Sequence, residues 1–314
     1  MEKNLVTISG YLKENTLEKI VSKTGKNAIR GNLIIATSEI ESHRVQFYVS
    51  ETTSSGTESK DYKSMVELLP EKTMTIATIL EEDHQASFAD ACERATKVWI
   101  SGYLDEYAKR SDTGEISIIQ VRGRRGGIRV PTATSAPFEP KTRFEAEVYV
   151  YEKSPELDVL GNETGRINIT GLIANYDNSV IKVGFVAPVK DGVADYVNGN
   201  FSVSDTIHIN GILVNTMHRV LVESATENHF GSGGRDQYST TFVNERVILG
   251  GDAKPIKEGE EGSITKNAVK IGLAKRESKI QSNSAFSASA AQTKGFTTAK
   301  TALAGRSTDD VEEF

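Results

Sequence analysis

Cysteine is almost absent from this sequence, since Cys92 is the only one in 314 residues. A single thiol excludes an intramolecular disulfide framework and any zinc site built from several cysteines. We therefore expect a reducing compartment, the cytoplasm. Long apolar runs are also missing. No stretch approaches the ~20 apolar residues of a membrane span, and no such run follows the N-terminus, so we expect no signal peptide.

Catalytic motifs are missing too. The sequence contains no phosphate-binding loop, no G-x-S-x-G and no H-E-x-x-H. The histidines do not have the spacing of metal ligands. The acidic run Glu81-Glu82-Asp83 is the only candidate for a hydrolase, and such runs in loops are usually just solvated. The sequence predicts a protein that is not an enzyme and has no cofactor and no metal.

A short pattern occurs four times, at residues 6–12, 98–104, 167–173 and 207–213. Each copy has two spaced β-branched residues, a polar residue, a glycine and a large residue. The alternation is typical of a strand with one buried face. A glycine inside a strand marks a bulge or a tight bend, and strongly curled strands are what a small closed barrel requires. The uneven spacing of the copies indicates two pairs, one in each of two domains.

The segments between the first two copies complete one domain. Residues 29–37 and 43–50 are rich in β-formers, residues 61–69 have helical spacing, and residues 116–121 alternate again. The order β-β-β-α-β-β is that of the OB-fold, a five-stranded Greek-key barrel. The second pair frames a smaller version with little room for a helix. We predict an all-β chain with a short helix, made of two OB-type barrels at 1–135 and 136–251; two unrelated β-sandwiches are the alternative.

The composition changes after residue 251. Ser, Ala, Thr, Lys and Gly dominate and aromatic residues nearly vanish, which is typical of a flexible linker. We predict a disordered tail, with a linker over 252–306 and an acidic tip over 307–314. A short helix at 265–280 is the alternative for part of this segment.

The pattern of the first domain favours binding to single-stranded nucleic acid, which needs cations for phosphates and aromatic faces for bases. Alternation places Arg30, Arg44 and Tyr48 together on the outer face of two adjacent strands, the usual ligand surface of this fold. Further candidates come from loops, the glycine-rich segment and nearby rings: Lys23, Lys26, Trp99, Tyr103, Tyr107, Lys109, Arg110, Arg122, Arg124, Arg125 and Arg129. Lower-ranked candidates lie in the second domain: Lys182, Tyr196, Phe201, His218, Arg219, Arg235 and Tyr238.

Charge supports this interpretation locally. The whole chain carries a formal charge of -6, where a dedicated duplex-DNA binder is often basic. Between residues 109 and 129, however, six basic residues stand against two acidic ones, a local charge of +4. Guanidinium groups beside glycines are suited to phosphate.

The first domain resembles the bacterial single-stranded DNA-binding protein family over residues 4–130. The matching segments are Ile8-Ser9-Gly10, Ala36-Thr37-Ser38, His43-Arg44-Val45 and residues 98–104. The resemblance implies an OB-fold, sequence-tolerant binding of single strands, and a role in DNA replication, recombination or repair. Ser42 stands where that family has an aromatic residue. The insertion over residues 144–160 and the overall divergence indicate a virus- or phage-encoded protein in the host cytoplasm. The extra barrel indicates a monomer or a small homo-oligomer such as a dimer, or one barrel for binding and one for docking.

The C-terminus resembles the same family. It reads Asp309-Asp310-Val311-Glu312-Glu313-Phe314, and the family's acidic tip with a terminal Phe docks into basic pockets on replication and repair proteins. The resemblance therefore assigns partner binding to Asp309, Asp310, Glu312, Glu313 and Phe314. Glu313 replaces the family's proline. A solubilising tail is the alternative here, and for the whole chain the rival function is a structural or assembly protein of a virion or scaffold.

Overall fold

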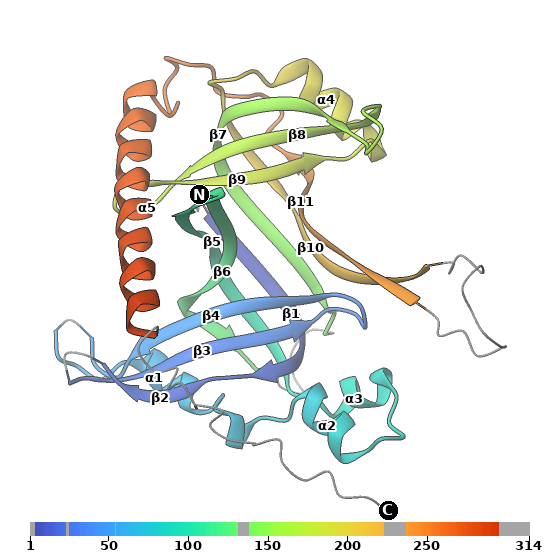
Figure 1. The fold of residues 1–314 in the computed structure, drawn as a ribbon, viewed down its shortest axis with the longest axis vertical. Coiled ribbons are helices and arrows are strands. Elements are labelled where there is room, and N and C mark those ends of the chain that lie inside the picture. Colours follow the sequence, from blue (N-terminus) through green and yellow to red (C-terminus); the bar gives the residue numbers. More distant parts are fainter. Residues whose placement is uncertain (1–3, 23–24, 54, 131–137, 223–236, 295–314) are drawn as a thin grey trace, which may run out of the picture.

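The computed structural model describes residues 4–22, 25–53, 55–130, 138–222 and 237–294. Their eleven strands form one continuous sheet, ordered β10-β11-β9-β8-β7-β1-β5-β6-β4-β3-β2. Two further pairings, β1 with β3 and β7 with β10, curl this sheet into two barrels, which lie one above the other in Figure 1. The prediction of an all-β chain with two OB-type barrels is confirmed.

The first barrel closes as an OB-fold does. Antiparallel pairs join β1 to β3, β3 to β4, β1 to β5 and β5 to β6, and the parallel pair β4–β6 completes the circle. One short helix is predicted before the fourth barrel strand; the structure has α1 there, capped by the Ser59 side chain, and three more short elements. The elements are β1 Asn4–Asn15, β2 Glu18–Val21, β3 Asn27–Ala36, β4 Ser42–Ser50, α1 Lys60–Val66, η1 Pro70–Lys72, α2 Ile76–Glu82, α3 Phe88–Arg94, β5 Lys97–Ser111 and β6 Gly114–Arg129.

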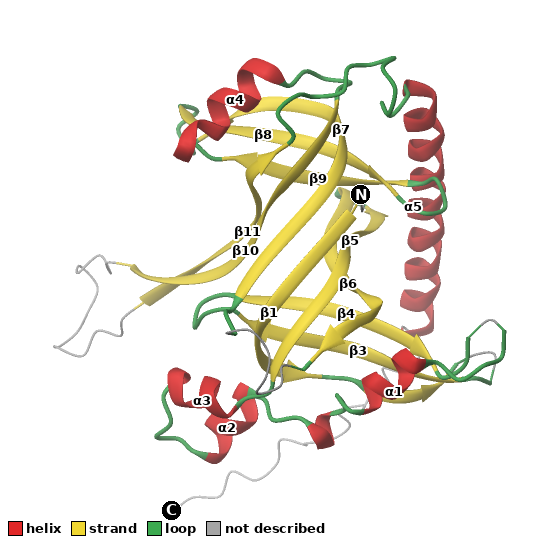
Figure 2. Cartoon of the chain, turned by 180° about the vertical axis from the view of Figure 1, so that it is seen from behind, coloured by secondary structure: helices red, strands yellow, loops and turns green. Residues whose placement is uncertain are grey.

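The second barrel repeats this topology. The antiparallel pairs are β7–β8, β8–β9, β7–β10 and β10–β11, and the parallel pair is β9–β11. The expectation of little room for a helix is wrong, because η2 and α4 occupy the position before the fourth strand and cover one end of the barrel (Figure 2). The elements are β7 Lys141–Leu157, β8 Glu163–Ala174, β9 Val180–Ala187, η2 Lys190–Gly192, α4 Val193–Asn200, β10 Thr206–Val222 and β11 Gln237–Gly251.

The repeated glycines lie where strands approach closely. Gly102 and Gly211 hold equivalent places in the fourth strand of each barrel, next to a shift of register. A Cβ atom on either would overlap a backbone oxygen of the neighbouring strand, that of Arg122 or that of Val247. The sequence-based interpretation of these glycines as marks of tight bends is confirmed at both positions.

The two barrels share one core. The first strands of the barrels pair antiparallel, with Val6 opposite Phe144. Their buried side chains form a single hydrophobic cluster that continues through this seam from Leu12 in one barrel to Phe185 in the other. The relative position of the barrels is therefore fixed by hydrogen bonds and packing rather than by a linker.

A long helix, α5 Lys266–Lys294, runs alongside both barrels (Figure 1). The predicted flexible linker over 252–306 is wrong for these residues. The helix buries Val269 and Ile280, and Gly272 packs against Val180. Its apolar stripe is sparse and interrupted by Arg276, which explains why the periodicity gave little signal. None of the helices in the described part of the chain is long and apolar enough to cross a membrane.

Candidate nucleic-acid interface

Four polar side chains form a row across the outside of the first barrel. Gln46 of β4 lies opposite Asn32 of β3 and is in parallel register with Arg122 of β6. Arg122 in turn lies opposite Tyr103 of β5. The neighbours Val45, Leu104 and Val121 are buried, so strand alternation directs the row outward. We call Asn32, Gln46, Arg122 and Tyr103 the outer row.

A second pair lies next to the outer row. Arg30 of β3 is directly opposite Tyr48 of β4, and the Tyr48 ring is 58% exposed. Together with the outer row, this pair lines a groove of about 730 Å³, here called the first-barrel groove. Its lining residues are Thr16, Glu18, Arg30, Gly31, Asn32, Gln46, Phe47, Tyr48, Tyr103, Arg122 and Gly123.

The cations of the groove have carboxylate partners. Arg30 Nε lies 2.9 Å from Glu18 Oε1, and Arg122 Nε lies 2.7 Å from Asp105 Oδ2. Both arginine side chains are about half exposed, at 58% and 46%. Exposed ion pairs contribute little to stability. A phosphate can therefore replace either carboxylate at small cost while the arginines remain in position.

Arg44 shares this face, as the sequence predicts. It lies on β4 two outward positions from Tyr48, opposite Ile34, and lines a neighbouring hollow of about 390 Å³. The other wall of that hollow is the β10–β11 hairpin of the second barrel, which contacts the first through Asn215 Nδ2, 2.6 Å from the Ser42 oxygen. The structure thus places Arg30, Arg44 and Tyr48 on one exposed face, with Arg30 and Tyr48 in the first-barrel groove and Arg44 outside it.

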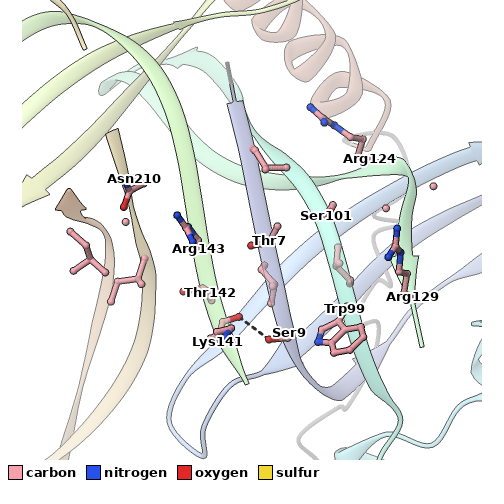
Figure 3. Close-up of a pocket in the computed structure, with 18 residues that line it drawn as sticks. Thr7, Ser9, Trp99, Ser101, Arg124, Arg129, Lys141, Thr142, Arg143 and Asn210 are labelled. Atoms are coloured by element: carbon pink, nitrogen blue, oxygen red, sulfur yellow. Dashed lines mark hydrogen bonds between the residues drawn. The ribbon is translucent and has the colours of Figure 1, made fainter. Parts of the chain in front are cut away.

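Trp99, Arg124 and Arg129 lie elsewhere, in a hollow at the junction of the barrels (Figure 3). Trp99 lies opposite Arg129, and its ring packs against Phe138 with 6.2 Å between centroids. The same hollow contains Lys141 and Arg143 of β7, which the sequence reasoning missed. Only the pairing of β7 with β1 brings these two cations beside Trp99, and no local pattern reveals that pairing.

The β5–β6 hairpin is less open than the sequence suggests. The sequence predicts that Tyr107, Lys109 and Arg110 lie in the loop between the fourth and fifth barrel strands, but they lie in β5, and α5 packs along the hairpin. Arg110 Nη2 lies 2.8 Å from Glu277 Oε1, and Asn283 Nδ2 donates to the Ala108 oxygen at 2.9 Å. Tyr107 keeps 37% of its surface exposed and Lys109 is half-buried. These three residues do not belong to the first-barrel groove.

The remaining candidates divide into those that are described and those that are not. Lys26 is exposed beside the start of β3. Lys23, the Arg125 side chain and the tip residues Asp309, Asp310, Glu312, Glu313 and Phe314 lie outside the described residues. In the second barrel Phe201 is buried in the core and Lys182 lies over the ring of Tyr151.

The second barrel does not repeat the outer row. The corresponding positions hold Asn168, Val186, Val247 and Ile212, connected by the same pairings. Nearby, Arg166 is held by two carboxylates, with Glu245 Oε2 at 2.6 Å and Glu156 Oε2 at 3.4 Å. The combination of arginines and tyrosines in a groove is therefore a property of the first barrel. Among the described residues, no group of His, Cys, Asp and Glu side chains could hold a metal ion.

Comparison with known proteins gives one family and a few distant structures. The model of the YorF family matches residues 2–285. No curated protein matches the sequence. The wild-type single-stranded DNA binding protein from Thermus aquaticus is 13% identical, with a TM-score of 0.43 over 84% of this chain and 97% of that one. A deletion mutant of that protein is also 13% identical, with a TM-score of 0.44 over 83% of this chain and 98% of that one. A replication protein A heterotrimer bound to ssDNA is 9% identical, with a TM-score of 0.20 over 90% of this chain and 71% of that one.

Proposed function

This chain belongs to the YorF family, and we propose that it binds single-stranded DNA, with little dependence on sequence, through the first-barrel groove. The observation that carries the proposal is the arrangement of Arg30 with Tyr48 beside Arg122 with Tyr103 on one outward face. Each arginine can contact a phosphate while the adjacent ring offers its face to a base. This is the chemistry that single-strand binders use.

The groove favours an unpaired strand over a duplex. Stacking on a tyrosine requires a base whose face is free, and base faces in a duplex are already stacked. Neither tyrosine nor arginine in this arrangement reads a base edge in a pattern that separates the four bases. Binding that tolerates any sequence follows from these two points.

The cellular role is the finer part of the proposal. A protein that coats single strands suits DNA replication, recombination or repair in the cytoplasm, where the acidic tip over 307–314 would recruit partner proteins. Its four carboxylates provide electrostatic attraction and its terminal Phe314 an apolar anchor. The resemblance of the tip to that of the bacterial single-strand binders supports this assignment.

A competition experiment tests the proposal. A fluorescently labelled oligo-dT is titrated with the full chain, and anisotropy is followed across a salt series with single-stranded DNA, RNA and duplex DNA as competitors. We expect saturable binding that weakens as salt rises, because phosphate contacts release counterions, and displacement by single strands far better than by duplex. Flat titrations at low salt would contradict the proposal and favour an assembly role.

A further inference from the structure

A second row of side chains crosses the junction of the two barrels. Arg129 of β6 lies opposite Trp99 of β5, Trp99 lies opposite Ser9 of β1, and Ser9 lies opposite Lys141 of β7. Beside this row, Thr7 of β1 lies opposite Arg143 of β7 (Figure 3). The strands β6, β5 and β1 belong to the first barrel, and β7 belongs to the second. The surface is therefore built jointly by both barrels.

These side chains line the hollow at the junction, here called the seam hollow, which measures about 1120 Å³. Among the described residues, its lining contains four cations and no carboxylate: Arg124, Arg129, Lys141 and Arg143 are joined by polar, apolar and glycine residues. Next to the hollow, Lys141 pairs with Glu139 at 2.6 Å and Arg143 with Glu145 at 3.2 Å. The lysine and both arginines of the two rows are well exposed to solvent, so an anion can reach them.

The seam hollow continues the first-barrel groove. Tyr103 lines the groove, and Ser101 and Trp99, the next two outward positions on β5, line the hollow. Successive outward positions on a strand are about 7 Å apart. On β6 Arg122 lines the groove and Arg124 the hollow, and between them the ladder shifts register, since Gly102 pairs with Gly123 but Ile100 pairs with Ile128. One strand of nucleic acid can thus pass from the first site to the second without leaving the surface of β5 and β6.

We infer that a single strand bound in the first-barrel groove extends into the seam hollow, where Lys141 and Arg143 of the second barrel bind its phosphates. This inference rests on the proposed function. The second barrel then contributes its first strand to the binding path, and its own apolar outer face, with Val186 and Val247, stays outside it. Trp99 lies within the hollow and reports its occupation.

A second copy of the chain is a less suitable occupant. In a dimer with twofold symmetry the same patch faces itself across the axis. Lys141 and Arg143 would then approach their own counterparts and those of Arg124 and Arg129, and like charges repel strongly where water is excluded. A polyphosphate chain neutralises the same cations. Charge therefore favours nucleic acid, and self-association is one outcome that the test must detect.

The single tryptophan allows a direct test. Oligo-dT of roughly 6 to 30 nucleotides, a range chosen because one OB fold covers ~4–16 nucleotides, is added to the full chain. Anisotropy of the labelled oligonucleotide measures total binding, and Trp99 emission measures occupation of the hollow. We expect the shortest oligonucleotides to bind with little change in Trp99 emission and longer ones to bind more tightly and quench it. Equal quenching at all lengths, or none at any length, overturns the inference.

Charge reversal of the second-barrel cations is the matching variant. Lys141→Glu with Arg143→Glu should leave short-oligonucleotide binding unchanged, abolish the extra affinity of long ones, and lower the salt slope for long ones by about 1.4, since each lost contact to a single strand removes ~0.7. Lys72→Glu with Lys266→Glu is the control, because both lysines also pair with a glutamate and line neither site. Wild-type affinity of the first variant for long oligonucleotides overturns the inference.

Two outcomes separate this inference from its alternatives. If even the short oligonucleotides fail to bind, the proposed function itself is wrong. If short oligonucleotides bind and longer ones bind no more tightly, only the inference is wrong. Sedimentation of the free protein completes the test, because a mass that falls on charge reversal of Lys141 and Arg143 would identify the seam surface as a contact between copies.

Discussion

Arg276 of α5 and Glu106 of β5 form a two-pronged ion pair, with Nη2 2.7 Å from Oε1 and Nε 2.8 Å from Oε2. The Glu106 side chain is only 3% exposed. Burial by itself would raise the pKa of this carboxyl, but hydrogen bonds from Arg276 and Ser117 outweigh it and hold the pKa below the usual range. The pair attaches the C-terminal helix to the first barrel, while Lys279 attaches it to Asp177 of the second at 2.8 Å.

Removing Arg276 should destabilise the protein. Arg276→Ala leaves a buried carboxylate without its cation, a change that typically costs ~3–5 kcal/mol. Ser117 and the Lys182 amide still donate to Glu106, so we expect a loss at the low end, about 3 kcal/mol, in urea unfolding. Arg276→Met combined with Glu106→Leu should recover most of it. Wild-type stability of the single variant would mean that α5 is not fixed by this pair.

Stability should fall on mild acidification because of His43. This side chain is 4% exposed. Burial lowers its pKa from the ordinary 6.5, against a smaller opposite effect of Glu41, whose Oε1 lies 3.4 Å from Nε2. The unfolded chain therefore takes up a proton at higher pH than the folded one, and the free energy of unfolding drops below about pH 6.5. Urea unfolding from about pH 7.5 to about pH 5.5 should show this slope in the wild type and a smaller one in His43→Gln. Equal slopes in the wild type and in His43→Gln would contradict this role of His43.

A side chain at Gly123 should be destabilising for a steric reason. A Cβ atom at this position would overlap the ring of Phe47, which is 3% exposed in the core beneath the groove. Gly123→Ala should cost about 1–3 kcal/mol through overpacking, and Phe47→Leu should relieve part of that cost. Gly184→Ala is the control, since nothing lies near its Cβ position, and it should be neutral in the same thermal melts. Equal effects of the two alanine variants would refute this explanation.

Arg122 should contribute one phosphate contact. Arg122→Ala is expected to weaken binding of oligo-dT similarly for all sequences and to reduce the slope of log K against log salt by about 0.7. Arg94→Ala provides a closely matched control, because Arg94 is 48% exposed and paired with Asp83 at 3.3 Å, much as Arg122 is paired with Asp105. An unchanged slope for Arg122→Ala would exclude this arginine from the interface.

Local alternation predicted the faces of strands well. It placed Arg30, Arg44 and Tyr48 on one face because β3 and β4 are adjacent in sequence and joined by a short loop, so the period of two also fixes which side each residue occupies. The sequence also predicted Tyr103 and Arg122 as nucleic-acid-binding residues. Their pairing with each other, and that of Arg122 with Gln46, depends on the register of β5 with β6 and on the closing parallel pair, which no short pattern contains.

The features that the sequence did not predict have one physical cause. Lys141 and Arg143 gain their place from the pairing of β1 with β7, which are separated by more than a hundred residues along the chain. The helix α5 is held by ion pairs and hydrogen bonds, Arg276 with Glu106 and Asn283 with Ala108, more than by an apolar stripe. The composition of the segment that contains α5 is therefore similar to that of a linker. Tertiary partners decided both features, and propensity did not.

The most direct test of the groove removes its two aromatic faces. Tyr48→Ala combined with Tyr103→Ala should weaken binding of a short oligo-dT by about 30-fold or more, since each stack is worth ~1–3 kcal/mol. Tyr176→Ala, a fully exposed tyrosine in the turn after β8, serves as the control and should bind as the wild type does. A folded double variant with wild-type affinity would contradict the account of this surface as the binding site.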